Sequence, residues 1–469
     1  MNIYPHQLVG ADWLATRPRA LLLDEQGLGK TITAIAAADQ IGKLSRASKL
    51  PGSVESILVV APSVVLHNWA KEFKKWSPTR TGQIIKHGRD NISPHVSVVI
   101  VSHKLFHSPY IQAQILDAQW DLVIVDEVHM FRNREAQRTE ALYGKHQNEK
   151  AATDLFEARA ADGDCVMAAT DRLWGLTGTP IPNNVSELWT HLRALAPELI
   201  PNEVGKPMSF SAFRARYCKT RPTRYGTKVV GNRNLAELKE RIGGFMLRRL
   251  KSEVLDLPDV RFETVALQPT KMPWEFKIIC DEVEALIADE DAGDATAAHG
   301  FAALRASSDY ARFRRWCGLA KVEQTVELLK AELEFGALDK VVIFAHHTDV
   351  VHGIADGLAG FGALQITGAT PPGQRTAVVD TFQRSDDHRV VVCNIVAGGV
   401  GVTLTAASDV VMAEMSFVPG ENAQAADRCH RIGQTRPVRV RCLALAGSID
   451  SDIVEILTTK TRMIREVLS

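Results

Sequence analysis

Short, mostly apolar runs recur throughout this sequence, and they limit how it can fold more than any other feature. They lie at 20–23, 57–60, 96–101, 122–125 and 173–176 in the first half, and at 341–345, 364–367, 390–393, 410–413 and 438–445 in the second. Continuous apolar runs of this length are typical of strands buried on both faces of a parallel sheet. The segments 30–41 and 185–195 carry apolar residues at helical spacing. Strands alternating with helices in both halves predict an α/β fold with two doubly wound lobes.

The first apolar run leads directly into DEQGLGKT, residues 24–31, which is followed by a helical pattern. Gly27 and Gly29 allow the backbone to turn so that its N–H groups face phosphate oxygens. Lys30 supplies a positive charge to the β- and γ-phosphates, and the hydroxyl of Thr31 can ligate Mg²⁺. The dipole of the following helix also favours an anion. The segment is therefore predicted to bind the phosphates of a nucleotide, although an aspartate replaces the first glycine of the usual GxxxxGK[ST] pattern.

Two adjacent carboxylates follow the run at 122–125. Asp126 can hold the coordination shell of Mg²⁺, and Glu127 can polarise the water that attacks the γ-phosphate. Such a pair at the end of a strand is ordinary on its own, but here it follows a phosphate-binding loop within the same lobe. We therefore expect Mg²⁺-dependent hydrolysis of a nucleoside triphosphate, with His129 linking hydrolysis to neighbouring motifs.

Small hydroxyl side chains flank a glycine at the end of the run at 173–176. Thr177, Gly178 and Thr179 lie within LTGTP. This segment can be a plain turn that caps the next helix. It can also sense the nucleotide from a neighbouring strand end, and the three residues are candidates for that coupling.

The second half contains QAADRCHRIGQ at 424–434. Arg428 and Arg431 are three residues apart and are expected to share one face of a helix. One interpretation is a solvated basic face. The other is a pair of arginine fingers that reach the γ-phosphate from the second lobe, a contact that accelerates phosphoryl transfer by about 10³–10⁵.

The net charge of zero is a cancellation between the two halves of the chain. Residues 1–250 hold 33 Lys+Arg and 24 Asp+Glu (33 − 24 = +9), and residues 251–469 hold 22 and 31 (22 − 31 = −9). The segment 206–249 alone has 12 basic and two acidic residues. It is either a solvated basic loop or a contact for the phosphates of a nucleic acid. The net charge of zero argues against a protein that binds a polyanion over its whole surface.

The seven cysteines are widely spaced and include no CxxC pair. This spacing disfavours a zinc site or a disulfide framework and is typical of a reducing compartment. The first residues have neither a basic segment nor an apolar core of the kind found in signal peptides. The uncharged run at 390–408 contains too many Gly, Ser, Thr and Asn residues for a membrane span. A cytoplasmic protein is predicted.

Taken together, these motifs resemble those of the Swi/Snf family of DNA-translocating ATPases in helicase superfamily 2. The segments that carry the resemblance are PHQLVGADWL (5–14), DEQGLGKT (24–31), VVAPSVVLHNWAKEF (59–73), VIVDEVH (123–129), LTGTPIPNNVSELW (176–189), FMLRRLKSEVLDLP (245–258), VVIFAHH (341–347), VAGGVGVTLTAAS (396–408) and QAADRCHRIGQ (424–434). An aspartate at the first glycine position, as at Asp24, is typical of this family. Val128 occupies the position at which a DEAH box has alanine. FAHH and Thr403 are similar to the HARP-type annealing-helicase branch.

The resemblance implies roles for individual residues. Nucleotide binding would involve Gln7, Gly27, Leu28, Gly29, Lys30, Thr31, Gly401 and Gln424, with Gln7 reading the adenine. Catalysis would involve Lys30, Asp126, Glu127, Arg428 and Arg431, Mg²⁺ would be held by Thr31 and Asp126, and coupling would involve His129, Thr177, Gly178 and Thr179. The candidate DNA contacts are Ser63, Asn68, Trp69, Ser102, Arg248, Arg249, His346 and His347.

The resemblance also implies the domain organisation. Residues 1–250 would form a RecA-like, ATP-binding lobe with a basic, irregular or helical segment at 197–249. Residues 251–469 would form a second RecA-like lobe with a helical insertion at about 270–335. The boundary is expected near 251–258, and a polar insert or exposed loop is expected at 143–170. The chain is similar in size to a bare, monomeric motor without accessory modules, as in small bacterial or viral members.

The function implied is ATP-driven movement along duplex or branched DNA, with ATP and Mg²⁺ bound in a cleft between the lobes. Two alternatives remain open from the residues. One is a helicase of the same superfamily that separates strands, and the other is a DNA-binding scaffold that retains the fold without hydrolysis. The intact Lys30, Asp126 and Glu127 disfavour the scaffold. A kinase of small metabolites would not explain two lobes or the basic segment.

Overall fold

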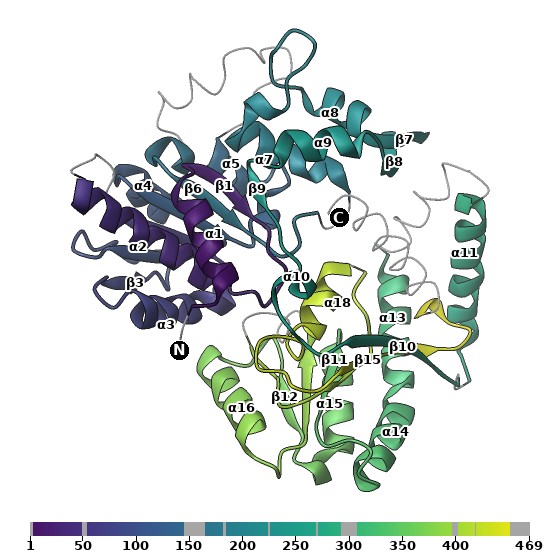
Figure 1. Ribbon diagram of the computed structural model, residues 1–469. Coiled ribbons are helices and arrows are strands. Elements are labelled where there is room, and N and C mark those ends of the chain that lie inside the picture. The colour runs from purple at the N-terminus through teal and green to yellow at the C-terminus, as the bar shows by residue number, and fades with distance from the viewer. Residues whose placement is uncertain are drawn as a thin grey trace. The chain divides into compact units, whose positions relative to one another are not determined.

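The structure, a computed structural model, describes residues 3–48, 54–144, 165–181, 184–223, 226–268, 271–291, 307–395, 402–417 and 419–450. It divides into two compact units (Figure 1). The first comprises Met1–Cys218 and Asn232–Leu255, and the second comprises Lys219–Gly231 and Asp256–Ser469. Each unit contains a parallel sheet with helices around it, which confirms the predicted α/β class. Within the described residues, no helix has the length and apolar character needed to cross a membrane.

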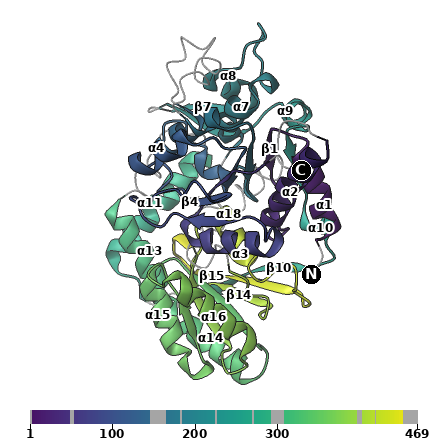
Figure 2. The same cartoon turned by 90° about the vertical axis from the view of Figure 1, so that its left-hand side faces the viewer.

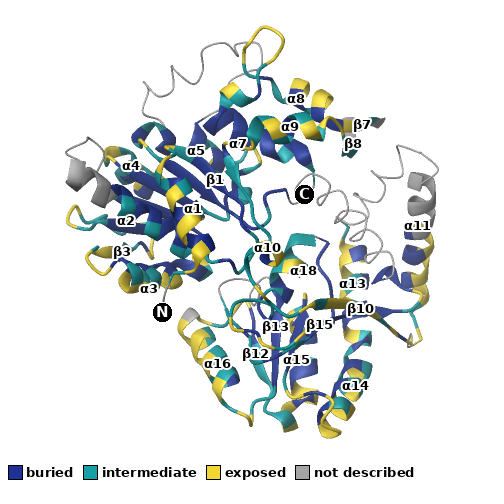
Figure 3. Ribbon diagram, in the orientation of Figure 1, coloured by how far each residue is buried: buried dark blue, intermediate teal, exposed yellow. Residues whose placement is uncertain are grey.

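The core of the first unit is a sheet whose described strands follow the order β3-β4-β2-β5-β6-β1-β9, with all neighbours parallel. The strands are β1 (Arg19–Leu22), β2 (Ile57–Ala61), β3 (Gly82–Ile84), β4 (Val98–Ser102), β5 (Leu122–Asp126), β6 (Leu173–Leu176) and β9 (Met246–Leu247). All five apolar runs of the first half form strands here, and every residue of β2 and β4 is buried. Figure 3 shows the sheet of the first unit largely in the dark blue of buried residues. Asp126 is paired with Leu176, so the polar residues after β5 and β6 meet at one edge of the sheet.

Helix α2 begins at Lys30, directly after the predicted phosphate loop. The α-helices of the first unit are α1 (Pro5–Ala15), α2 (Lys30–Ser48), α3 (Leu66–Trp76), α4 (Pro109–Asp117), α5 (Gln137–Tyr143), α7 (Leu188–Leu195), α8 (Phe210–Tyr217), α9 (Leu235–Ile242) and α10 (Lys251–Val254). Short 3₁₀ helices are η1 (Ser63–Val65), η2 (Val128–Phe131), η4 (Val166–Ala169), η5 (Val185–Glu187) and η6 (Pro197–Leu199). Helices α1, α2 and α3 lie side by side (Figure 1).

The second unit is built on a sheet whose described strands follow the order β10-β15-β14-β11-β13-β12, again with all neighbours parallel. The strands are β10 (Val260–Leu267), β11 (Val341–Ala345), β12 (Leu364–Ile366), β13 (Val390–Asn394), β14 (Asp409–Met412) and β15 (Val438–Leu445). The helices are α11 (Trp274–Asp291), α13 (Ser308–Ala320), α14 (Val322–Glu334), α15 (Thr348–Gly357), η7 (Ala359–Phe361), α16 (Pro372–Arg384) and α18 (Pro419–Ala426). Helices α13, α14 and α15 pack together, with α15 against β11 and β13 (Figure 2).

The segment 197–249, predicted to be irregular or helical, contains both helices and strands. It contains α8, a two-stranded sheet of β7 (Cys218–Thr223) and β8 (Gly226–Asn232), α9, and the short strand β9. Its many basic residues lie on the exposed faces of short elements. In α9, for example, only Leu238 is buried. The strands of this segment were not predicted from its basic composition.

Some predictions fall on residues outside the described ranges. The expected polar insert at 143–170 lies mostly there, at 145–164. The expected helical insertion at about 270–335 contains α11, α13 and α14, while 292–306 lies outside the description. Residues 396–401, which include Gly401, are also outside it.

Candidate functional site

The loop between β1 and α2 holds the predicted phosphate-binding residues. Gly27 and Gly29 have φ values of 86° and 84°, a left-handed conformation that favours glycine. The ammonium of Lys30 donates to the carbonyl oxygens of Asp24 at 2.8 Å and Glu25 at 3.3 Å. The positive charge therefore lies against the loop at the N-terminus of α2, where unpaired N–H groups favour an anion.

Gln7 lies directly against this loop. Its Nε2 donates to the carbonyl oxygen of Leu28 at 3.0 Å, and its Oε1 accepts from the backbone N–H of Tyr4 at 3.0 Å. A Cβ at position 29 would collide with the amide nitrogen of Gln7, so the close approach requires glycine. The structure thus brings Gln7 and Leu28 together with the phosphate loop.

The aspartate at the first glycine position of the motif is paired with an arginine from the other end of the first unit. Asp24 is fully buried, and its carboxylate accepts hydrogen bonds from Nε of Arg249 at 2.9 Å and from Nη2. Arg249 also donates to the carbonyl oxygen of His6. Arg249 therefore links the phosphate loop to α1 within this unit, and its predicted contact with DNA stays a prediction. The neighbouring Arg248 is half-buried and donates to the carbonyl oxygen of Leu23 at 3.1 Å.

Glu127 lies at the end of β5 in a left-handed conformation, with φ 50° and ψ 49°. Its Oε1 accepts from Nε2 of Gln26 in the phosphate loop at 3.3 Å, and its Oε2 accepts from the hydroxyl of Thr177 at 3.1 Å. Nδ1 of His129 lies 3.2 Å from the same Oε2. One carboxylate thus joins the phosphate loop to the segment after β6.

The predicted coupling residues form a small hydrogen-bonded network. Nδ1 of His129 lies 2.9 Å from the hydroxyl of Thr177 and 3.4 Å from that of Thr179. A Cβ at Gly178 would lie 2.8 Å from the side chain of Gln26, so glycine lets the two segments approach. The structure brings the four coupling candidates together beside Glu127.

The two carboxylates of the pair have opposite electrostatic environments. Burial and the negative charge of Glu127 raise the pKa of Asp126, against the lowering effects of Trp69 and Lys30. Burial alone would raise the pKa of Glu127, but the hydrogen bond and charge of His129, together with Lys30, lower it. Glu127 is therefore held ionised, as required of a group that polarises water.

Asp126 is fixed from two sides by residues that sequence reasoning did not place there. The indole N–H of Trp69 in α3 donates to Oδ2 of Asp126 at 2.9 Å. Nε2 of His103, in the loop after β4, lies 2.8 Å from the carbonyl oxygen of Asp126. Trp69 is only 1% exposed and contacts the candidate Mg²⁺ ligand, and its predicted contact with DNA stays a prediction.

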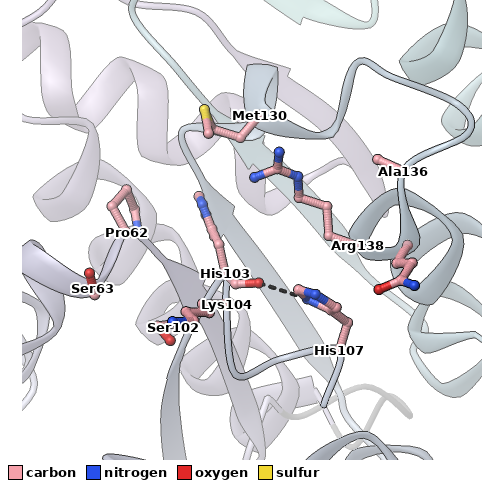
Figure 4. Close-up of a pocket in the computed structure, with 10 residues that line it drawn as sticks. Pro62, Ser63, Ser102, His103, Lys104, His107, Met130, Ala136 and Arg138 are labelled. Atoms are coloured by element: carbon pink, nitrogen blue, oxygen red, sulfur yellow. Dashed lines mark hydrogen bonds between the residues drawn. The ribbon is translucent and has the colours of Figure 1, made fainter. Parts of the chain in front are cut away.

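The remaining DNA candidates of the first unit differ in exposure. Ser63 and Asn68 are exposed, whereas Ser102 is buried and its hydroxyl accepts from the backbone N–H of Leu105 at 3.1 Å. Ser63 and Ser102 line a hollow of about 500 Å³. Figure 4 shows this hollow and the side chains around it.

In the second unit, Arg428 and Arg431 do not lie on a helix, which corrects that prediction. Helix α18 ends at Ala426, and the chain then turns. Gln434 stabilises the turn because its amide donates to the carbonyl oxygens of Ala407 at 2.8 Å and Cys429 at 3.1 Å. Arg431 donates to the carbonyl oxygen of Val402 at 3.3 Å. Gln424 belongs to α18 itself.

His346 and His347 follow β11 and surround a carboxylate that the sequence interpretation missed. Oε2 of Glu414 accepts from the backbone N–H groups of both histidines at 2.9 Å, and its Oε1 lies 2.7 Å from Nδ1 of His347. Glu414 is 4% exposed; burial alone would raise its pKa, but His347 and Lys321 lower it. Glu414 could have been identified from the sequence as a charged residue directly after an apolar run, which is the pattern that identified Asp126. His346 is exposed.

Comparison with known proteins agrees with this arrangement. The family model described as the SNF2-related domain matches residues 6–150 and 158–302, and the helicase conserved C-terminal domain matches 320–433. The chain is 31% identical over 472 residues to the SWI/SNF-related matrix-associated actin-dependent regulator of chromatin subfamily A-like protein 1 of Xenopus tropicalis, covering 99% of this chain and 44% of that protein. It is 29% identical over 467 residues to the DNA annealing helicase and endonuclease ZRANB3 of Mus musculus, covering 96% and 39%.

A solved structure described as the Sulfolobus solfataricus SWI2/SNF2 ATPase core in complex with dsDNA covers 100% of this chain and 93% of its own, with 23% identity and a TM-score of 0.45. The chain spans less than half the length of the curated relatives named above. The SNF2-related model alone matches more than half of the chain. The chain therefore belongs to the SNF2 family of helicase-related proteins.

Proposed function

We propose that this chain is the motor core of an ATP-dependent enzyme that moves along duplex DNA. The observation that carries the proposal is the cluster at one edge of the first sheet. There, the phosphate loop after β1, Glu127 after β5 and Thr177 after β6 are joined by hydrogen bonds through Gln26 and Thr177. The order β5-β6-β1 brings all three segments to neighbouring strand ends.

The residues in this cluster suit Mg-ATP. The loop N–H groups and Lys30 would hold the β- and γ-phosphates, while Thr31 and Asp126 would ligate Mg²⁺. The metal ion would neutralise charge on the phosphates. Glu127, held ionised by His129, would orient and polarise the attacking water. Thr177 would keep that carboxylate aimed, and Gln7 would read the adenine.

The proposed roles in the second unit rest on the family motifs. Arg428 and Arg431 would stabilise charge on the γ-phosphate during turnover. Gln424 and Gly401 would contribute to nucleotide binding. ATP binding would favour one arrangement of the two units and product release another, so that each turnover advances the motor on DNA. The lobes proposed are residues 1–250 and 251–469.

Charge supports DNA as the partner. The segment 206–249 holds 12 basic and two acidic residues, and basic side chains on a motor bind phosphates irrespective of base sequence. Two curated relatives are named for chromatin regulation or DNA annealing. We propose duplex or branched DNA as the substrate of this chain and a monomeric motor as its working form.

Steady-state ATP hydrolysis with duplex, forked, single-stranded and RNA ligands tests the proposal. Duplex or forked DNA should stimulate turnover, and Lys30→Ala should abolish both the basal and the stimulated rates. If duplex DNA leaves the wild-type rate at the level of Lys30→Ala, the chain is not a DNA-dependent ATPase.

A second assay distinguishes a translocase from a strand-separating helicase. A translocase should displace the third strand of a triplex in an ATP-dependent manner without unwinding a blunt duplex. Unwinding at comparable rates would instead identify a helicase. Binding without any turnover would identify the scaffold alternative.

A further inference from the structure

A buried segment without regular structure leads from the second sheet toward the turn that carries Arg428 and Arg431. Residues 414–417 follow β14, are at most 7% exposed, and belong to neither a helix nor a strand. Helix α18 comes next in the chain, and the turn follows it. Buried backbone N–H and C=O groups outside regular structure need other partners, because leaving them unpaired costs free energy. The partners of this segment therefore decide how firmly α18 and the turn are held.

One set of partners comes from α13, which belongs to the helical insertion and, like α18, to the second unit (Figure 1). Nη2 of Arg314 donates to the carbonyl oxygen of Met415. The guanidinium carbon of Arg314 lies 4.7 Å from the ring centroid of Phe417, which is a cation–π contact. Gly318, one turn further along α13, packs on Glu414, because a Cβ there would lie 2.5 Å from Oε1 of that carboxylate. Helix α13 therefore contacts the segment at both of its ends.

The other partner comes from α18 itself. Nδ2 of Asn422 donates to the carbonyl oxygen of Ser416 at 2.8 Å, and Oδ1 of Asn422 accepts from the backbone N–H of Ser416 at 2.8 Å. The hydroxyl of Ser416 also donates to Oε2 of Glu421. One amide side chain thus satisfies both backbone groups of Ser416 and ties α18 to the buried segment.

The end of α18 in turn fixes the main chain of Arg428. The backbone N–H of Arg428 donates to the carbonyl oxygen of Ala425 at 3.2 Å. The carbonyl oxygen of Arg428 accepts from the backbone N–H of the buried Leu404 at 2.8 Å. A shift of α18 would therefore move Arg428 with it.

We propose that Arg314 and Asn422 are positioning residues that hold Arg428 where it acts on the γ-phosphate. This inference rests on the proposed function, which assigns that action to Arg428. Arg314 fixes the buried segment from the helical insertion, and Asn422 ties α18, with Arg428 at its end, to the same segment. An error of about 1 Å in the position of a group that contacts the reacting atoms can cost about 10²-fold in rate. The helical insertion therefore sets how accurately the second unit places its arginine.

Steady-state ATP hydrolysis with saturating duplex DNA tests the two side chains separately. Arg314→Ala and Asn422→Ala should each lower kcat by about 10- to 100-fold, because each loosens the support of Arg428. The Kd of a fluorescent ADP analogue should change little, since ADP lacks the γ-phosphate. Arg314→Lys keeps a cation that can donate to Met415 and should restore most of the rate. Arg312→Ala is the matched control, because it removes an exposed arginine from the same helix and should leave kcat unchanged.

A double-mutant cycle distinguishes positioning from a general structural effect. Arg428→Ala alone should lower kcat by about 10³–10⁵, the usual contribution of an arginine finger. If Arg314 and Asn422 act through Arg428, their alanine variants should cause no further loss when combined with Arg428→Ala. Single-turnover hydrolysis of radiolabelled ATP measures these low rates. Alanine variants that lower the rate by the same factor with and without Arg428 would overturn the positioning roles.

The outcomes separate this inference from the proposed function. If DNA does not stimulate turnover of the wild type above that of Lys30→Ala, the proposed function fails. If DNA stimulates the wild type and Arg428→Ala is inactive, but Arg314→Ala and Asn422→Ala both keep the wild-type kcat, the positioning inference fails alone. Thermal unfolding identifies a variant that does not fold, in which case the other variant decides.

Discussion

The carboxylate of Asp24 accepts two hydrogen bonds from the guanidinium of Arg249, a residue 225 positions later in the chain. The pair lies at the base of the phosphate loop, where most phosphate-binding motifs have glycine. Because Arg249 also donates to the carbonyl oxygen of His6, three segments distant in sequence meet at this point. Asp24, which departs from the usual glycine of the motif, is therefore held in place by Arg249 at the start of the phosphate loop.

Removing Arg249 should destabilise the first unit strongly. Arg249→Ala leaves the Asp24 carboxylate buried without its partner, and breaking a buried pair in this way costs about 3–5 kcal/mol. Urea unfolding followed by intrinsic fluorescence should show the transition of the first unit at a lower urea concentration than in the wild type. Arg241→Ala is a matched control, because its partner Glu237 is partly exposed and such pairs contribute about 0–1 kcal/mol. Equal shifts for the two variants would contradict the structural role of Arg249.

Glu127→Gln should abolish catalysis without weakening nucleotide binding. The amide keeps the size of the carboxylate and can still accept from Thr177, but it cannot act as a base. We expect kcat to fall by about 10²–10⁴, which is the usual contribution of general base catalysis. The Kd of a fluorescent ADP analogue should change little from that of the wild type. Glu135→Gln, a change to an exposed carboxylate in the same unit, should leave kcat unaltered.

Glu414 should make the stability of the second unit depend on pH. Its pKa in the folded state lies below the ordinary value of about 4.3, so the ionised form stabilises the fold. That contribution is present above the ordinary pKa and is lost as the pH falls through the folded-state pKa. Glu414→Gln should therefore be less stable at pH 7, by about 1–3 kcal/mol, and the difference should narrow below pH 4.

Urea midpoints of the wild type and Glu414→Gln at several pH values provide this measurement. Glu334→Gln serves as the control, because Glu334 forms an exposed pair with Lys330. A gap between the wild type and Glu414→Gln that stays constant down to pH 3 would rule out the ionised carboxylate as the cause.

Gly175→Ala should strain the strand that separates the phosphate loop from Glu127. A Cβ there would lie 2.6 Å from Cδ2 of Leu21 and 3.1 Å from both Cγ atoms of Val128. Overpacking of this kind typically costs about 1–3 kcal/mol. We expect reduced stability and a lower ATPase rate. Gly205→Ala does not serve as a control because its φ is positive, but Gly373→Ala, which meets no atom within 4 Å, does.

The apolar runs predicted the strands well because parallel strands are buried on both faces. Burial of both faces leaves a compositional record that needs no knowledge of neighbours. Strand β10 has no continuous apolar run, because most of its residues are exposed and charged residues interrupt it. Strand β9 has two residues and exists because β1 offers a free edge. Neither strand could be predicted without the sheet already present.

The residues of the nucleotide cluster could be predicted because each lies within a short sequence motif. The residues that hold them in place come from distant segments. The contacts of Trp69 and Arg249 with Asp126 and Asp24 could not be predicted because the partners are far away in sequence. The turn after α18 was mistaken for helix because its stabilising residue, Gln434, lies at the far end of the motif. Long-range hydrogen bonds of this kind have no signature in spacing or composition.

The left-handed backbone at Glu127 has a consequence for how this protein can change. A non-glycine residue in that conformation costs on the order of 1–2 kcal/mol, which glycine would avoid. Glycine at position 127 would remove that backbone cost, but it would also remove the carboxylate that accepts from Gln26 and Thr177 and pairs with His129. The side chain proposed to polarise water therefore also holds its own backbone in this unfavourable conformation, so that any change at this position alters turnover and local structure together.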